Sequence, residues 1–374
     1  MNKKQRKIIE LTVLLLCILL IQFIRHFPAA GEFYAQHIYP LIASFLSAFS
    51  SLFPFSIGDC FLFMASVGIL GYFIKTLWKK GKRKRRLGNI ALFLGWIYVW
   101  FYFAWGLNYF RENYYARTTI SPATYTAEDF KRFLADYIAR LNAGYEPAQF
   151  LPPSVVSEEI RKGYTNWKDT FKLTTPPSVL KPKTMLFSSL FSKVGVSGYM
   201  GPFFTEFNLN GELRPEEYPS VFAHEAAHRL GVSSEAEANF YAWLICTQSE
   251  IPQIRHSGNF MVMGHILGNA SRLLPPEEYR YFLSTIRPEI LEQYKSRQEY
   301  WQQKYSPGIG KIQNYIYNLF LKSNRISSGL KNYSEVVGLL LSWQRYSSLN
   351  KPTISPKTAA KESISGNKIS APAS

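Results

Sequence analysis

The chain has 374 residues, of which 47% are hydrophobic, 16% aromatic and 18% charged, and its formal net charge is +17. That length accommodates one domain of about 200 residues together with membrane segments. The apolar and aromatic content exceeds that of ordinary soluble enzymes and indicates contact with lipid. Only three cysteines occur, Cys17, Cys60 and Cys246, and all three lie in apolar segments. This excludes a small fold held together by extracellular disulfides.

Three apolar segments, at about 8–26, 57–77 and 87–106, predict transmembrane helices. The first follows a basic leader, and no clean small-residue cleavage site comes after it, which favours an uncleaved span over a signal peptide. Residues 33–55 are also apolar, but two prolines and several Ser and Ala residues make them a poor span. We predict that they form an amphipathic helix on the outer membrane surface or packed on the spans.

A run of basic residues at 79–86 separates the second and third segments, and residues 3–7 are also basic. Because cytoplasmic loops are enriched in Lys and Arg, we expect the N-terminus and the loop 78–86 to lie in the cytoplasm of a bacterium. Three spans of the cytoplasmic membrane then place residues 108–374 outside. So short a run between two spans is better explained by topology than by nucleic-acid binding, so membrane lipid is the expected partner and nucleic acid is not.

Residues 108–345 predict a mostly helical extracytoplasmic domain, which makes the fold class mainly α with a small β element. The expected helices are 126–143, 275–304, 308–323 and 333–345. The best strand signal is at 203–209. Residues 346–374 have few large apolar side chains and are expected to be a disordered tail.

The most specific motif is His224-Glu225-Ala226-Ala227-His228. Tyr218-Pro219 marks a helix start and Gly231 a helix end. Residues four apart lie on one face of a helix, so both imidazoles point at one metal ion. Two imidazoles and a carboxylate suit one zinc ion (Zn²⁺) and leave one position open for water, from which Glu225 is placed to take a proton. The alternative is a surface helix with solvated histidines.

The next segment supplies the third ligand. Ser234 is a natural N-cap, and the spelling Ser234-Glu235-Ala236-Glu237 predicts a capping box in which Glu237 reaches back to the cap backbone. That role leaves Glu235 as the favoured third ligand, with Glu237 as the alternative. Asn239 lies one turn after Glu235 on the same face, where it supports a ligand by hydrogen bonding.

Other polar residues are also candidate ligands or hydrogen-bond donors. His256 and His265 are weaker candidates for the metal, because a lone His on a helix is more often solvated or hydrogen-bonded than a ligand. The oxyanion formed during peptide hydrolysis also needs a further donor, and Tyr199, His265 and Arg272 are candidates of equal standing.

The Glu235-x-x-x-Asn239 arrangement resembles the Glu-x-x-x-Asp of gluzincin metallopeptidases, and the spelling Glu-x-Glu-Ala-Asn is similar to bacterial antirepressor-type metallopeptidases. More widely, the chain resembles a bacterial membrane family known as domain of unknown function 3810. That resemblance rests on 38–40, 54–59, 105–109, 196–199, 206–210, 224–231 and 235–240. It implies a polytopic membrane protein with a metallopeptidase-like domain and no settled substrate. In zincin-like folds an edge strand above the metal pairs with the substrate, so a strand just before the motif helix is in the expected place; a plain surface hairpin is the alternative.

The expected function is therefore that of a membrane-anchored zinc metallopeptidase that hydrolyses an unidentified peptide or protein outside the cell. Two alternatives stay open. One is a non-catalytic membrane protein with a structural zinc site, in which a fourth protein ligand closes the coordination. The other is a zinc hydrolase acting on cell-wall or lipid amide bonds.

Overall fold

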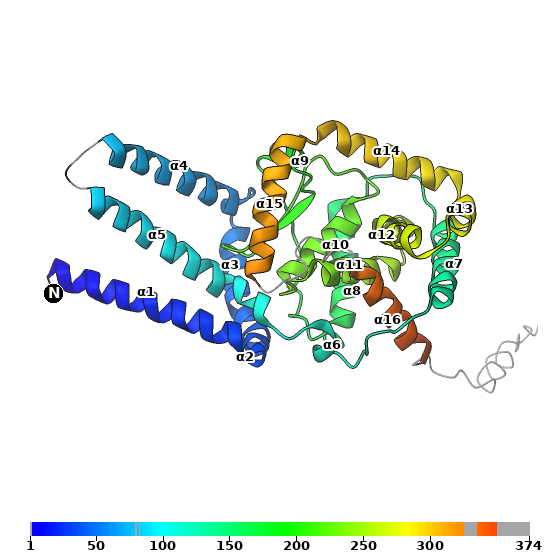
Figure 1. Ribbon diagram of the computed structural model, residues 1–374, viewed down its shortest axis with the longest axis horizontal. Coiled ribbons are helices and arrows are strands. Elements are labelled where there is room, and N and C mark those ends of the chain that lie inside the picture. The colour runs from blue at the N-terminus through cyan, green and yellow to red at the C-terminus, as the bar shows by residue number, and fades with distance from the viewer. Residues whose placement is uncertain (1, 79–80, 82, 325–334, 350–374) are drawn as a thin grey trace, which may run out of the picture.

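The computed structural model describes residues 2–78, 81, 83–324 and 335–349, and it is mainly helical. Three helices are long and apolar enough to cross a membrane: Lys4–His26 within α1 (Lys3–His26), α4 (Ile57–Trp78) and α5 (Arg83–Ala104). They extend together from one side of a globular part (Figure 1). The three predicted spans are thus confirmed as helices. Residues 83–86 belong to α5, so the predicted basic loop is shorter than expected.

The predicted helix at 33–55 is broken into shorter pieces. α2 (Pro28–Phe33) leads into the π-helix η1 (Tyr34–Ile38) and then into α3 (Tyr39–Ser51), while Pro54 lies beyond the end. Pro40 lacks the N–H that an α-helical ladder needs, which accounts for the change of helix type before it. α3 lies where the spans meet the globular part (Figure 1) and packs against α5, which is one of the two positions expected for this segment.

The globular part consists of helices around one small sheet. Its helical elements are η2 (Gly106–Phe110), α6 (Tyr114–Arg117), α7 (Ala127–Ala143), α8 (Pro153–Trp167), α9 (Ser188–Ser192), α10 (Tyr218–Arg229), α11 (Glu235–Thr247), α12 (Pro252–Leu273), α13 (Pro276–Ser284), α14 (Pro288–Lys304), α15 (Pro307–Ser323) and α16 (Val336–Leu349). α10 and α11 lie at the centre of the core, where Phe222, Ala226 and Phe240 are fully buried. The polar motif is therefore carried by the most buried helices of the domain.

The sheet has three strands in the order β1 (Lys183–Thr184), β3 (Glu206–Leu209), β2 (Gly198–Gly201). β1 runs parallel to β3, and β2 runs antiparallel to it with Tyr199 opposite Asn208. The predicted strand at 203–209 was too long. Residues 202–205 form the hairpin turn, and Thr205 has a φ of 53° that ends strand geometry.

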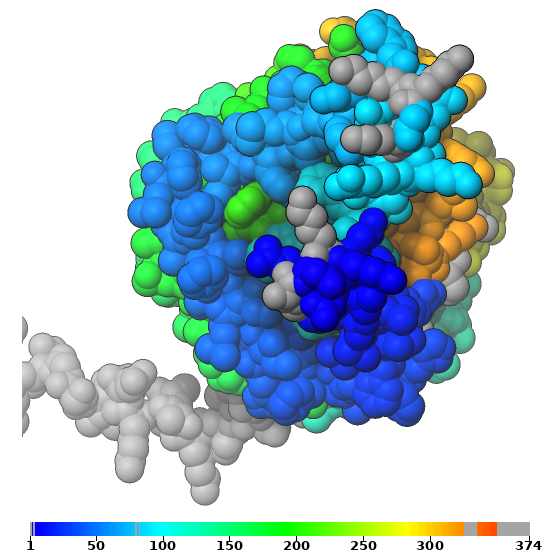
Figure 2. Space-filling view, turned by 90° about the vertical axis from the view of Figure 1, so that its left-hand side faces the viewer, coloured from blue at the N-terminus to red at the C-terminus, as the bar shows by residue number. Residues whose placement is uncertain are grey.

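The hairpin turn reaches into the spans. The ring of Phe203 lies 5.2 Å from that of Phe61 on α4 and 6.4 Å from that of Phe101 on α5. The N-terminus of α4 also holds the sheet, because the Glu206 carboxylate accepts hydrogen bonds from the backbone of Ile57 and Gly58 at 3.2 and 2.8 Å. Viewed along the spans, green atoms of the globular part are visible between the blue helices (Figure 2). The spans and the sheet are thus packed as one body.

Two C-terminal predictions also need correction. The expected helix 275–304 is two helices, because Pro288 begins α14 and residues 285–287 separate it from α13. The helix expected at 333–345 continues to Leu349, so the tail does not begin at 346. The predictions for residues 325–334 and 350–374 lie outside the described residues. The helices expected at 126–143 and 308–323 are confirmed, the first with Thr126 as its cap.

Candidate metal centre

The α10 helix carries both histidines on one face. It begins at Tyr218 with a proline in its first turn, and Gly231 follows it with a φ of 88°, the left-handed geometry that glycine adopts without strain. His224 and His228 are one turn apart, and their Nε2 atoms approach to 3.1 Å. The predicted shared face is therefore confirmed.

The return helix α11 brings Glu235 to the same point. Its Oε2 lies 3.2 Å from Nε2 of His224 and 3.5 Å from Nε2 of His228. Donor atoms held at about 2.0–2.1 Å by a tetrahedral zinc ion lie about 3.3 Å from one another. The three residues form the group of metal-ligating side chains found in the described part of the chain. The side chains present therefore fit a zinc ion.

Neighbouring groups orient these donors. Nδ1 of His228 lies 2.8 Å from the carbonyl oxygen of Val232, so an Nδ1–H donated there leaves Nε2 for a metal. The hydroxyl of Tyr317 on α15 donates to Oε1 of Glu235 at 2.7 Å, which leaves Oε2 facing the histidines. Nδ1 of His224 is buried without a hydrogen-bond partner. Two of the three candidate ligands thus have a fixed orientation.

The electrostatics of the cluster favour cation binding. Burial opposes charge on each group, yet Glu235 raises the pKa of His228 to about 9. Burial likewise opposes ionisation of Glu235, but His228 and His224 hold the pKa of Glu235 well below its usual range. The site therefore stabilises one positive charge beside the Glu235 carboxylate, a charge that a proton or a metal ion supplies.

Glu225 lies beside this cluster against strand β2. Burial raises the pKa of Glu225 to about 7, although the charges of the two histidines lower it. Its Oε2 is buried and has no hydrogen-bond partner. A Cβ atom built on Gly198 would lie 2.5 Å from both Cγ and Oε1 of Glu225. Only glycine fits at that point of β2, so the strand and the Glu225 carboxylate are in direct contact.

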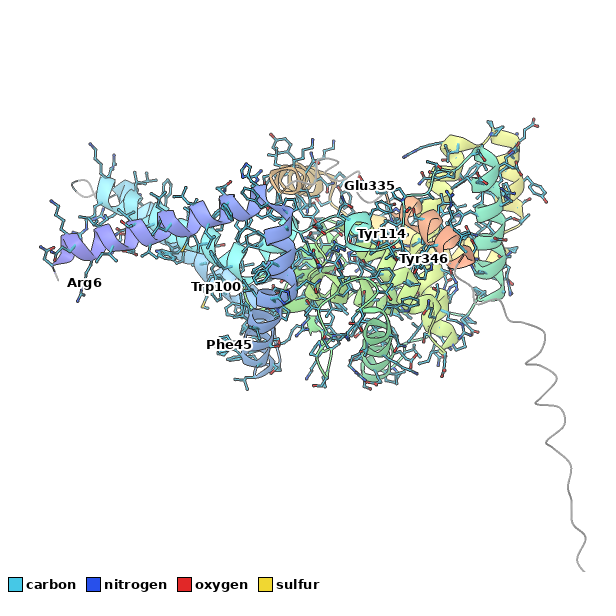
Figure 3. All side chains as sticks on the ribbon, turned by 90° about the horizontal axis from the view of Figure 1, so that it is seen from below. Arg6, Phe45, Trp100, Tyr114, Glu335 and Tyr346 are labelled. Carbon is cyan, nitrogen blue, oxygen red and sulfur yellow. The ribbon has the colours of Figure 1, made fainter. Side chains whose placement is uncertain are left out.

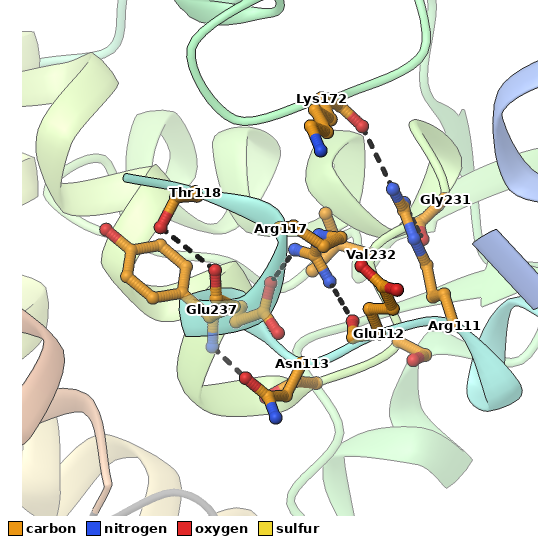
Figure 4. A network of polar contacts seen from close by, with 12 residues as sticks. Arg111, Glu112, Asn113, Arg117, Thr118, Lys172, Gly231, Val232 and Glu237 are labelled. Carbon is orange, nitrogen blue, oxygen red and sulfur yellow. Dashed lines mark hydrogen bonds and ion pairs between the residues drawn. The ribbon is translucent and has the colours of Figure 1, made fainter. Parts of the chain in front are cut away.

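Glu237 points elsewhere. Its carboxylate pairs with Arg117, and both side chains are buried. Arg117 also donates to the Glu112 carbonyl at 2.8 Å, and Arg111 lies in the same network (Figure 4). Although burial disfavours the charge of Arg117, Glu237 raises its pKa. Ser234 caps α11 by accepting from the Glu237 backbone at 3.3 Å, as predicted. The structure therefore brings Glu235, and not Glu237, to the histidines, and the Glu237 carboxylate pairs with Arg117.

The cluster opens into a cleft of about 670 Å³. Its lining includes Glu225, Asn239 and His265 beside the three candidate ligands, residues 195–200 along β2, and residues of α15. Asn239 is buried on the same side of α11 as Glu235. A cleft of this size accommodates several side chains of a peptide or a comparable small molecule.

The other predicted candidates fall into two groups. His265 and Tyr199 line the cleft, but the Tyr199 hydroxyl donates to Asp59 at the end of α4. Arg272 is exposed and is not among the lining residues. His256 bonds to Gln293 at 2.8 Å and is not in the metal-ligating group. Tyr317 was missed, because nothing in the sequence connects it to Glu235, 82 residues away.

The membrane part completes the end of the motif helix. The last carbonyl groups of an α-helix have no partner within it. Here the indole of Trp105 donates to the His228 carbonyl at 2.9 Å and the Tyr39 hydroxyl donates to that of Arg229 at 2.6 Å. Arg111 donates to the Gly231 carbonyl at 3.0 Å and pairs with Glu32. Side chains from α3 and from residues 105–111, which follow α5, thus hold the C-terminal end of α10.

Comparison with known protein families identifies the family of this chain. A family model described as "Protein of unknown function (DUF3810)" matches residues 34–341. The chain belongs to this family. The matched range contains the last two spans, the sheet, the histidine pair and Glu235, so the candidate metal centre lies within the part that defines the DUF3810 family. No curated protein and no solved structure matched this DUF3810 member.

Proposed function

We propose that this DUF3810 member is a membrane-anchored zinc metallopeptidase that hydrolyses peptide bonds on the outer side of a bacterial cytoplasmic membrane. The observation that carries the proposal is the convergence of His224 Nε2, His228 Nε2 and Glu235 Oε2 beside a carboxylate without a partner, in an open cleft. Metal-ligating residues on two helices, with an acid on the first, are the arrangement that hydrolytic zinc sites use. The resemblance to gluzincin metallopeptidases supports the same conclusion.

A zinc ion held by His224, His228 and Glu235 would supply a Lewis acid that lowers the pKa of a water molecule and polarises the scissile carbonyl. A side chain of the protein itself carries out the proton transfers. Glu225, with its pKa raised to about 7 by burial, accepts a proton from the attacking water and returns it to the leaving amine. Its lack of a hydrogen-bond partner leaves Oε2 available for this task.

The sheet supports a peptide as the substrate. β2 is the edge strand, because β3 pairs with it on one side only. Asn210 donates its backbone N–H to the Ser197 carbonyl at 2.9 Å, so residues 197, 199 and 201 bond to β3 and alternate positions face outward. The outward groups of Gly198 and Met200 border the cleft. An extended peptide that pairs with them passes next to Glu225.

The coordination number favours catalysis over a structural role. A structural zinc site is closed by four protein ligands, whereas a catalytic site keeps one position open. Within the described residues the metal-ligating group comprises three side chains. His265 lines the same cleft, and burial lowers its pKa, so it is a neutral donor suited to the developing oxyanion.

The decisive experiment compares Glu225→Gln with the wild type in the full-length protein. We expect about one zinc ion per chain in both, but loss of essentially all cleavage of a complex peptide mixture by the variant, because Glu225 contacts the water and not the ion. Bound zinc is measured by elemental mass spectrometry and cleavage by peptide mass spectrometry.

The matched control is His228→Ala, which should lose both zinc and cleavage, since two remaining ligands hold zinc poorly. Cleavage by Glu225→Gln at the wild-type rate would overturn the proposed mechanism. Full zinc occupancy in His228→Ala would overturn the metal assignment.

A further inference from the structure

The α15 helix has two contrasting faces. Its outward side carries five large apolar side chains that are 46–67% exposed: Ile309, Ile312, Tyr315, Ile316 and Leu319. At about 100° per residue these positions cover an arc of about 120°. The adjoining side, centred about 100° further around the helix, carries Gln313, Tyr317 and Phe320, which line the cleft. Lys311 and Lys322 lie beside one edge of the apolar arc, where long basic side chains reach lipid headgroups.

This helix lies at the level where the spans end. The ring of Phe320 is 5.8 Å from that of Phe101, which lies one turn before the end of α5, and 5.7 Å from that of Tyr109. α15 runs across the ends of the spans rather than along them (Figure 1). Seen from below, α15 and the segment carrying Phe45 both lie where the spans meet the globular part, on opposite sides of the molecule (Figure 3).

Two other segments show the same pattern at this level. α3 and its C-cap residue expose Leu41, Phe45 and Leu52, each 73–75% exposed, and α3 buries Tyr39, Ala43 and Leu46 on the other side. The ring of Phe187, which is exposed before α9, packs 5.8 Å from that of Phe63 on the apolar span α4. Exposed apolar side chains on three separate elements therefore surround the spans where the membrane surface is expected. An apolar surface continuous with membrane spans fits lipid better than a soluble partner.

The inner face of α15 is tied to the metal centre. Tyr317 donates to Glu235, and Gln313 and Asn314 border the cleft. The helix is therefore a wall of the cleft as well as an exposed amphipathic element.

We infer that α15 lies in the outer membrane interface, with its apolar face among the lipids and its polar face forming one wall of the cleft. Resting on the proposed function, this assigns the substrate class: a peptide segment held at the membrane surface, next to a transmembrane or lipid anchor, rather than a freely diffusing peptide. The position of the helix itself does not depend on catalysis.

The test measures depth in lipid and uses no activity. Single cysteines labelled with an environment-sensitive fluorophore are introduced by Ile312→Cys, Ile316→Cys and Gln313→Cys into the full-length protein with Cys17, Cys60 and Cys246 replaced. The protein is reconstituted in phosphatidylcholine–phosphatidylglycerol vesicles containing lipids with a spin label near the headgroup. Phe45→Cys is the reference on α3, and Tyr281→Cys, 65% exposed on α13 at the far side of the domain, is the aqueous reference.

We expect quenching at 312 and 316 to match that at 45 and to exceed that at 281 severalfold, with 313 close to 281. This alternation around one helix distinguishes a lipid-facing surface from a helix that is merely near the membrane. Quenching at 312 and 316 no stronger than at 281 would overturn the inference. Because neither zinc nor a substrate enters the measurement, that result would leave the proposed peptidase function standing, and loss of the peptidase proposal would leave the depth measurement unchanged.

Discussion

Glu235 and Glu237 are two buried carboxylates on the same turn of α11, yet they belong to different clusters. Two residues correspond to about 200° around a helix, so the side chains leave on opposite sides. Glu235 faces two imidazoles and a cleft, and Glu237 faces the guanidinium of Arg117 in the core. Both clusters are buried, and the first lines the cleft. Access to a cleft, rather than charge or burial, distinguishes the candidate metal ligand from the structural ion pair.

Glu235→Gln should break the first cluster. A neutral amide is a poor zinc partner, so we expect zinc affinity to fall by about a thousandfold or more, which is about 4 kcal/mol. Competition titrations with a chelator measure the change. Unchanged zinc affinity would show that another residue is the third ligand.

Glu237→Gln is the matched change in the second cluster. It leaves Arg117 buried without a counter-charge, and we expect a loss of about 3 kcal/mol in the free energy of unfolding, with zinc affinity unaltered. A helix-capping role alone would cost less, about 1 kcal/mol. Denaturation of the reconstituted protein measures the free energy of unfolding, and the same zinc titration measures the zinc affinity. Together they show which cluster each substitution affects. Loss of zinc from this variant, with retention in Glu235→Gln, would exchange the roles of the two glutamates.

The pH dependence of zinc binding tests the charge of His228 in the first cluster. Glu235 raises the pKa of His228 to about 9, and zinc needs the neutral imidazole. As the pH falls below about 9, each pH unit should weaken zinc binding about tenfold, or about 100-fold between pH 9 and pH 7. Calorimetry in buffers of different ionisation enthalpy should detect one proton released per zinc bound near pH 7. Binding without proton release would contradict the charged state assigned to His228.

The smallest expected effect is that of Tyr317→Phe, which removes the hydrogen bond to Glu235 without altering the packing of the ring. We expect zinc affinity to fall by about tenfold, as for other groups that orient a ligand. Tyr315→Phe, on the outward face of the same helix, should leave zinc affinity unchanged. Equal affinities in the two variants would show that Glu235 needs no support from α15.

Local sequence patterns predicted many of the elements of this structure. The spacing of His224 and His228 predicts a shared helix face, and Ser234 marks the start of α11, because both effects act within a few residues. The partners of these groups were not predictable. Arg117 and Tyr317 lie 120 and 82 residues away from the glutamates that they contact. Such pairings depend on tertiary packing, which periodicity and spacing do not encode.

The sheet also shows that tertiary contacts are not predictable from local sequence patterns. Apolar and β-prone residues at 203–209 predicted one strand, but Phe203 and Phe204 pack against aromatic rings of α4 and α3 instead of continuing it. Contact with the spans outweighed local strand propensity. The strand that borders the metal centre, β2, contains two glycines in four residues and has a weak strand signal. Its Gly198 is explained by the close approach of Glu225.

The hydrogen bonds from Trp105, Tyr39 and Arg111 to the end of α10 impose an order on biogenesis. The Arg229 carbonyl gains its Tyr39 partner, and the His228 and Gly231 carbonyls gain their side-chain partners, only when α3 and the residues after the third span are in place. A soluble fragment that begins after residue 111 would expose the end of the motif helix. We therefore expect the group formed by His224, His228 and Glu235 to reach its final geometry only after the spans have entered the membrane.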